Sequence, residues 1–206
     1  MKKRVLSLLL ALSLIFSLAT VTGVTVSAAT IDSVAPATGD GTANNPYQIG
    51  TASELYWFAQ TVNGGSTAVC AVITADITIN EGVLDADGNL NSGDFAAWPM
   101  IGYNIDYIGT FDGAGHTISG LYLDDGYVQG VGLFGKVGSG GKVCNLSVTD
   151  SYFKGNSYWN GAVCGENKGT IENCYADATV VGKNSVGGVC GQNGGGGTIT
   201  NCYSVG

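Results

Sequence analysis

Residues 161–167 read Gly-Ala-Val-Cys-Gly-Glu-Asn, and residues 187–193 read Gly-Gly-Val-Cys-Gly-Gln-Asn. A second block follows each of them, Thr-Ile-Glu-Asn-Cys-Tyr at 170–175 and Thr-Ile-Thr-Asn-Cys-Tyr at 198–203. Fainter copies of the second block occupy 117–122 and 142–147, and one of the first block occupies 132–135. The anchors Ile118, Val143, Ile171 and Ile199 are 25, 28 and 28 residues apart. This period is too short for a repeat of two helices and fits one coil of a β-solenoid.

Alignment of the second blocks assigns a direction to each side chain. One position holds only Gly or Asn, the residues that best tolerate left-handed backbone angles, which predicts a corner. Stacked Asn amides at such a corner could bond from coil to coil. Strand alternation then predicts that one set of apolar residues points inward and a set of tyrosines points outward. The aligned corner residues are Gly120, Asn145, Asn173 and Asn201; the inward set is Leu121, Leu146, Cys174 and Cys202; the outward tyrosines are Tyr122, Tyr175 and Tyr203.

The segment before the repeats has the pattern of one amphipathic helix over residues 52–63. Thr51 and Glu54 form a capping box, apolar residues follow at helical spacing from Leu55 to Val62, and two glycines end the pattern. We expect this helix to cover the open first coil, because an uncapped solenoid exposes an apolar end and unpaired strand edges. Alternating apolar residues over 72–79 predict the strand of that first coil.

The N-terminus has the features of a secretory signal. Three basic residues precede an apolar run, and Val-Ser-Ala at 26–28 suits a signal peptidase, so residues 1–28 are predicted to be removed; the alternative is a single membrane anchor. The expected organisation is therefore a signal peptide (1–28), a lead-in with the capping helix (29–66) and a β-helix (67–206). The chain ends directly after a repeat anchor, so we expect it to be truncated at the C-terminus and to be part of a longer protein.

Composition and charge narrow the classes of function. Hydrophobic residues make up 45% and charged residues 12% of the chain, which favours a folded domain over disorder. Removal of residues 1–28 takes away three of the eight basic residues, and the remaining five lysines against 16 acids give a net charge of −11. A nucleic-acid partner is excluded on these grounds, because no basic patch could neutralise phosphates. No second apolar stretch is long enough to span a bilayer after the signal.

The ordered set of motifs resembles bacterial surface proteins with GLUG repeats. The resemblance rests on Asp-Gly-Thr at 40–42, Pro-Tyr-Gln-Ile at 46–49, Trp-Pro-Met-Ile-Gly at 98–102, Gly-Thr-Phe-Asp-Gly-Ala-Gly-His-Thr-Ile at 109–118 and the repeats themselves. It covers about residues 39–206 and implies an all-β fold, a right-handed parallel β-helix with an N-terminal capping helix. The family includes adhesin-like proteins and some immunoglobulin A peptidases. No His-Glu-x-x-His motif is present in this chain, so the peptidase activity is not carried over.

Two groups of residues suggest chemistry of their own. Oxygen-bearing side chains at alternate positions make Asp85, Asp87, Asn89 and Asp94 candidates for a calcium site, although the loop is two residues shorter than the twelve-residue calcium loop and has Leu90 where glycine makes the sharp turn. An insertion loop rich in turn formers is the alternative. His116 with Asp112 invites comparison with polysaccharide-cleaving β-helix enzymes, but the Phe-Asp-Gly-x-Gly-His turn is a structural feature of the resembled family and the mature chain has no arginine.

The six cysteines could form disulfides in a secreted chain. Column alignment instead places cysteine where other coils carry a large apolar residue: Cys164 and Cys190 align with Phe134, and Cys174 and Cys202 with Leu146. We therefore expect free thiols in the core, with Cys164–Cys190 and Cys174–Cys202 as the candidate bridges if disulfides form, because stacked coils bring Cα atoms within disulfide range.

The sequence as a whole favours a non-catalytic, secreted or cell-surface β-helix module for adhesion or ligand presentation. Tyr122, Tyr175 and Tyr203 are the candidate ligand contacts, because outward aromatic rings can stack on sugars; their alternative role is an aromatic ladder on a solvated face. The expected partner is carbohydrate or another extracellular polymer on a host or cell wall. No catalytic residues and no cofactor are expected, calcium being the one candidate ion. The competing hypotheses are a polysaccharide-active β-helix enzyme and the N-terminal part of a larger surface protein or peptidase.

Overall fold

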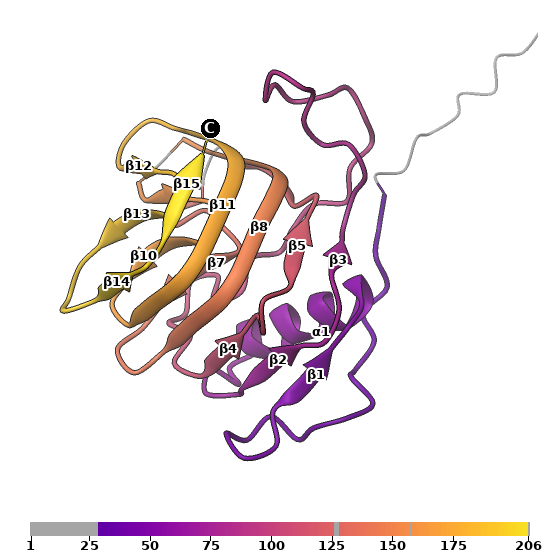
Figure 1. Cartoon of the computed structure of the whole chain (residues 1–206), viewed down its shortest axis with the longest axis vertical. Coiled ribbons are helices and arrows are strands. Elements are labelled where there is room, and N and C mark those ends of the chain that lie inside the picture. Colours follow the sequence, from indigo (N-terminus) through magenta and orange to yellow (C-terminus); the bar gives the residue numbers. More distant parts are fainter. Residues whose placement is uncertain (1–28, 126–127, 157, 206) are drawn as a thin grey trace, which may run out of the picture.

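The computed structural model describes residues 29–125, 128–156 and 158–205; the predicted signal peptide lies outside them. The chain winds into stacked coils whose strands pair in parallel, so the predicted β-solenoid is confirmed (Figure 1). The main sheet runs in the order β1-β2-β4-β8-β11-β14. Its strands, with those that pair beside them, are β1 (Tyr47–Ile49), β2 (Ala71–Ile73), β3 (Ile77–Thr78), β4 (Thr110–Asp112), β5 (Thr117–Ser119), β6 (Tyr122–Asp125), β8 (Lys142–Gly155), β11 (Thr170–Gly182), β14 (Thr198–Thr200) and β15 (Tyr203–Val205).

Two smaller parallel sheets close the coils on the other side. One runs in the order β13-β10-β7, and the other pairs β12 with β9. These strands are β7 (Phe134–Val137), β9 (Asn160–Gly161), β10 (Cys164–Asn167), β12 (Val186–Gly187) and β13 (Cys190–Asn193). Cys164 lies opposite both Phe134 and Cys190, as the column alignment predicted.

In the last three coils, residues that are 28 positions apart in the sequence lie opposite each other on adjacent strands. Ile171 pairs with Val143 on one side and Ile199 on the other. The following asparagines, Asn145, Asn173 and Asn201, all have φ of 53°, which confirms the predicted left-handed corner. Their amides form a directional ladder: Asn201 Nδ2 donates to Asn173 Oδ1 at 3.2 Å, and Asn173 Nδ2 donates to Asn145 Oδ1 at 3.0 Å.

The predicted alignment of the 117–122 copy was wrong. Ile118 pairs with Val148, and Phe111 occupies the position opposite Val143. Gly120, with φ of 72°, belongs to a second corner, where its backbone N–H donates to Thr149. Its neighbour Leu121 is buried as predicted. However, the Leu121 backbone N–H donates to Ser151 of β8, so Leu121 lies beside that part of the strand and not beside Leu146.

A single helix in the described residues, α1 (Ala52–Asn63), has the bounds that the capping box predicted. Thr51 Oγ1 accepts a hydrogen bond from the Glu54 backbone N–H at 3.2 Å, and the Glu54 carboxylate accepts from the Gly50 N–H at 2.9 Å. The apolar face of the helix is fully buried against the first coils, with the Phe58 ring 5.6 Å from that of Phe111 and 6.1 Å from that of Tyr107. Helix α1 therefore covers one end of the solenoid (Figure 1).

The predicted single strand over residues 72–79 is interrupted. It forms β2 and β3, separated by an exposed break at residues 74–76, and β1 pairs with β2 on its outer side. The first coil therefore begins one strand earlier than predicted, at β1. Three residues are too few for periodicity to identify β1 as a strand.

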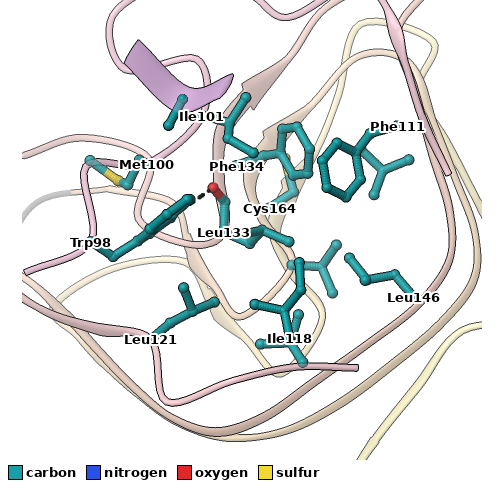
Figure 2. Packing of buried hydrophobic residues seen from close by; sticks show 14 of the residues in the cluster. Trp98, Met100, Ile101, Phe111, Ile118, Leu121, Leu133, Phe134, Leu146 and Cys164 are labelled. Carbon is teal, nitrogen blue, oxygen red and sulfur yellow. Dashed lines mark hydrogen bonds between the residues drawn. The ribbon is translucent and has the colours of Figure 1, made fainter. Parts of the chain in front are cut away.

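The interior is a continuous column of apolar side chains from successive coils (Figure 2). Phe111 and Phe134 meet edge to face with ring centroids 5.2 Å apart. Trp98 is almost fully buried, and its indole N–H donates to the Leu133 carbonyl at 3.0 Å. The buried indole N–H therefore has the hydrogen-bond partner that a buried polar group needs.

Candidate functional site

The predicted outward tyrosines form two separate ring pairs on the main sheet. The Tyr175 and Tyr203 rings lie 4.8 Å apart, and both are outward neighbours of the Asn corner. Tyr122 instead pairs with Tyr152, with centroids 6.2 Å apart and planes 20° from parallel. The expectation of one row through Tyr122, Tyr175 and Tyr203 was therefore wrong, because the misaligned copy displaced Tyr122 by five residues along β8.

An acidic groove lies beside the Tyr175–Tyr203 pair, beneath the segment that we call the insertion loop (residues 81–95). Its volume is about 340 Å³. Asp85 contributes one carboxylate from the loop, while Asp150 and Asp177 contribute two from the sheet. The remaining lining residues are Leu84, Ala86, Gly88 and Thr149.

Side chains of the sheet hold the insertion loop in place. Asp150, at φ of 45°, accepts hydrogen bonds from the backbone N–H groups of Val83 at 3.3 Å and Leu84 at 2.8 Å. Thr179 Oγ1 donates to the Gly88 carbonyl at 2.5 Å. The groove is thus bounded by a loop anchored at two points and by the outer face of β8 and β11.

Tyr175 and Asp177 connect the ring pair to the groove. They are two residues apart on β11 and so lie on the same face of the sheet. Partial desolvation, then the nearby Asp177 carboxylate and Tyr203, raise the pKa of the Tyr175 hydroxyl. Like an ordinary tyrosine, the phenol is protonated at neutral pH and can donate a hydrogen bond. The arrangement combines aromatic surface, hydroxyl groups and carboxylate acceptors within one strip of the sheet.

Of the calcium candidates, Asp85 and Asn89 make hydrogen bonds within the insertion loop. Asp85 Oδ1 accepts from the backbone N–H groups of Asp87 at 2.9 Å and Asn89 at 2.8 Å, and Asn89 Nδ2 donates to Asp85 Oδ2 at 3.2 Å. These hydrogen bonds lower the pKa of Asp85, the one from the Asn89 backbone most. Asp94 is exposed near the end of the loop. Within residues 29–125, 128–156 and 158–205, no three His, Cys, Asp or Glu side chains are grouped to hold a metal ion.

Asp112 and His116 belong to the corner of their own coil and do not converge on a shared cleft. Asp112 Oδ1 accepts from the Ala114 backbone N–H and from Asn145 Nδ2, both at 2.9 Å, so it ends the asparagine ladder. His116 Nδ1 lies 3.2 Å from Asp76 Oδ1. The hydrogen bond from the Thr117 backbone, followed by that with His116, lowers the pKa of Asp76. These contacts stabilise the turn at 112–117.

The six cysteines, all within the described part of the chain, are free thiols. Burial raises the pKa of Cys174 to about 12 and that of Cys144 to about 11, which keeps both protonated and poorly nucleophilic. Burial also raises the pKa of Cys164, while its hydrogen bond to the stacked Cys190 thiol lowers the pKa of Cys190. The candidate disulfide partners are thus neighbours in adjacent coils.

At the end of α1, the Asn63 side chain holds the backbone of residues 99–103 through hydrogen bonds, a clamp that the sequence did not predict. Asn63 Nδ2 donates to the carbonyls of Pro99 at 3.2 Å and Met100 at 2.8 Å, and Asn63 Oδ1 accepts from the N–H groups of Gly102 and Tyr103, both at 2.9 Å. An apolar cavity of about 380 Å³ adjoins it, lined in part by Trp98 and Leu123. The Trp-Pro-Met-Ile-Gly motif was visible in the sequence, but nothing in it indicated Asn63 as the partner.

Comparisons with known proteins identify relatives that are much longer. No family model matches the chain. It is 32% identical over 155 residues to halomucin of Haloquadratum walsbyi. The aligned segment covers 75% of this chain and 2% of that protein. It is 33% identical over 145 residues to a putative Gly-rich membrane protein of Evansella cellulosilytica. That aligned segment covers 69% of this chain and 16% of that protein. The chain therefore spans only a small part of either relative.

A solved structure has a similar fold. The crystal structure of a putative immunoglobulin A1 protease from Bacteroides ovatus superposes with a TM-score of 0.51 and 25% identity, over 83% of this chain and 60% of that one. In the described residues, no helix has the length and apolar character needed to cross a membrane. Together the fold and the relatives indicate a surface or membrane-associated protein built on a β-solenoid.

Proposed function

We propose that this chain is a non-catalytic, secreted or cell-surface module of the GLUG-repeat type that binds neutral carbohydrate. The observation that carries the proposal is the Tyr175–Tyr203 ring pair, 4.8 Å between centroids, beside the acidic groove under the insertion loop. Sugar rings present apolar faces to aromatic side chains and hydroxyl groups to polar ones. Binding sites of this kind combine aromatic surface with a few placed polar groups.

Electrostatics select neutral over acidic ligands. Asp85, Asp150 and Asp177 line the groove, and the chain without residues 1–28 carries a net charge of −11 from its five lysines and 16 acids. A polyanionic glycan would be repelled both at long range and in the groove. Sugar hydroxyls, in contrast, can donate to carboxylate oxygens, and such charge-assisted hydrogen bonds are stronger than neutral ones.

The solenoid supports adhesion or ligand presentation rather than chemistry. Asp112 and His116 are engaged by contacts of the turn at 112–117, and burial raises the pKa of the Cys144, Cys164 and Cys174 thiols. The relatives support a location at the surface. Under this proposal the chain holds its sheet face outward as a rigid platform, and calcium is not required for binding.

Substitution of Tyr175 with alanine should weaken binding to a neutral oligosaccharide about tenfold, equivalent to about 1.4 kcal/mol. The expected loss comes from the apolar stacking surface, so Tyr175→Phe, which keeps the ring, should retain most of the affinity. Isothermal titration calorimetry with cellohexaose, xylohexaose and mannohexaose measures both effects.

Tyr103→Ala is the matched control, because Tyr103 is an exposed tyrosine, 43% accessible, on the loop clamped by Asn63. It should leave the affinity unchanged. Equal affinities for the wild type and Tyr175→Ala, or equal losses in Tyr175→Ala and Tyr103→Ala, would place the site elsewhere. Absence of binding to every neutral glycan, with binding to polygalacturonate, would overturn the proposal.

A further inference from the structure

A strained tryptophan lies in the connection between β8 and β9. Trp159 has φ of 68°, a left-handed angle that a bulky side chain rarely adopts. The residues opposite it in the neighbouring coils are Gly130 and Ser185, with φ of 75° and 51°, because the residue that follows each of the three pairs in register. The bend at this position therefore needs a left-handed residue, which glycine provides without strain. The fold itself gives no reason for tryptophan here.

The neighbouring coils hold Trp159 in this conformation. The Tyr158 carbonyl accepts a hydrogen bond from the Gly130 N–H at 3.0 Å, and the Trp159 carbonyl accepts one from the Val131 N–H at 2.9 Å. Gly191 packs so closely that a Cβ atom on it would lie 2.4 Å from the Trp159 carbonyl carbon. The backbone of Trp159 is therefore fixed from two sides, and strained residues that the surrounding structure fixes are concentrated at functional sites.

The same bend presents two aromatic side chains next to each other. Tyr158 is 51% exposed and Trp159 is partly exposed, with ring centroids 6.4 Å apart and planes 50° apart. Gln129 precedes Gly130, so by the same register it lies beside Tyr158, and its side chain is exposed. Asn156, two residues before Tyr158, is also exposed. Amide side chains both donate and accept hydrogen bonds, so the rings have adaptable polar neighbours.

The chain segments that form this bend are almost free of charge. Residues 128–135 and 155–165 contain no Asp, Glu, Lys or Arg, and residues 178–189 contain only Lys183. A single lysine is too little to hold a polyanion, because the chain without residues 1–28 has a net charge of −11. Two rings with amide neighbours also offer little apolar surface for the core of a protein interface. Neutral sugars fit this combination, because their apolar faces stack on aromatic rings and their hydroxyls bond to amides.

We propose that Tyr158 and Trp159 form a second binding site for neutral carbohydrate. The inference rests on the proposed function for its ligand class, while the site itself is separate. Tyr175 lies opposite Ser147, before the bend at Asp150, whereas Tyr158 lies after that bend. A polymer that engages both sites gains avidity that a short oligosaccharide lacks.

Tryptophan fluorescence tests this site directly, because Trp159 is the tryptophan that its ligand would contact. Of the other two tryptophans, Trp98 is 1% exposed, and Trp57 packs edge-on against Tyr47 with ring centroids 5.0 Å apart. The chain without residues 1–28 is titrated with cellohexaose, xylohexaose and mannohexaose. We expect a saturable change in emission and protection from iodide quenching with at least one of them. Trp57→Phe should give the same response, and Trp159→Phe should lose it.

The substitution Trp159→Gly separates binding from folding. Glycine occupies the opposite position in the preceding coil and adopts the left-handed angle freely, so the variant should keep its circular dichroism spectrum and melting temperature. In a Tyr175→Ala background, which removes stacking at the other site, Trp159→Gly should weaken the remaining affinity about tenfold in calorimetry. Tyr158→Ala, at an exposed position, should have a similar effect, and Tyr103→Ala should have none.

The outcomes distinguish this site from the Tyr175–Tyr203 pair. Tryptophan emission that does not respond to any of the three sugars, or an affinity unchanged by both Trp159→Gly and Tyr158→Ala, would overturn this inference even where Tyr175→Ala weakens binding. A full emission response together with wild-type affinity in Tyr175→Ala would instead support this site and overturn the Tyr175–Tyr203 site. An emission shift with phosphatidylcholine vesicles and with no sugar would also overturn the inference, because it would show that the aromatic pair is a membrane contact.

Discussion

Replacement of Ile171 with aspartate is expected to lower the free energy of unfolding by about 4 kcal/mol or more. Ile171 is fully buried between Val143 and Ile199, so the substitution removes an apolar side chain and introduces a carboxylate with no partner. Truncation of a buried isoleucine alone costs about 2–5 kcal/mol, and burial of an unpaired charge adds to it. In a domain of this size the melting temperature should fall by roughly 10 °C or more.

The control introduces aspartate one residue further along the chain, at position 172. Glu172 is half exposed and pairs with Lys142 at 2.9 Å, so Glu172→Asp should change stability by less than about 1 kcal/mol. In the Ile171→Asp variant, burial should raise the folded-state pKa of the introduced carboxyl group above its unfolded value. The unfolded state then loses its proton first as the pH rises, so the deficit should be larger at pH 7 than at pH 4. Thermal melts of equal midpoint for the two variants would show that Ile171 does not face the core.

Phe58→Ala is expected to have the second largest effect, a loss of about 3–5 kcal/mol. The Phe58 ring is fully buried against Tyr107 and Phe111, and it joins α1 to the first coils. Its removal leaves a cavity at the covered end of the solenoid, and the surrounding coils can collapse into it only in part. The midpoint of urea denaturation should fall, and a second, earlier transition would appear if the helix detaches before the coils unfold.

Gln60→Ala on the same helix is the comparison, because Gln60 is exposed and alanine favours helix. We expect its free energy of unfolding to lie within about 0.5 kcal/mol of the wild type. A Phe58→Ala variant as stable as Gln60→Ala would mean that α1 does not stabilise the solenoid as a cap.

Local patterns predicted the elements whose determinants are adjacent in sequence. The Thr51–Glu54 capping box predicted α1. The Val-Cys-Gly blocks at 163–165 and 189–191, aligned with Leu-Phe-Gly at 133–135, predicted the register of Cys164 against Phe134 and Cys190. The 117–122 copy was misaligned because β8 has two residues with left-handed angles, Asn145 and Asp150, and Gly120 lies beside the second of them rather than the first. Composition alone cannot separate two corners that require the same backbone angles.

The groove could not be predicted, because its walls come from distant parts of the chain. The hydrogen bond from Thr179 to Gly88 joins residues 91 apart, and Asp150 binds the backbone of residues 83 and 84. The carboxylates of the insertion loop suggested calcium because their spacing was visible, whereas the sheet residues opposite them were not. The clamp by Asn63 was missed for the same reason.

The most direct test of a binding module without catalysis is one incubation of the secreted chain with a panel of neutral and acidic polysaccharides. The panel is assayed with and without millimolar calcium, because a bound cation would reverse the local charge of the groove. We predict retention on neutral polysaccharides in affinity electrophoresis, and no new reducing or unsaturated sugar ends in any sample. Protein-dependent release of such ends from polygalacturonate or a neutral glycan, abolished by His116→Ala or Asp112→Asn, would contradict this account.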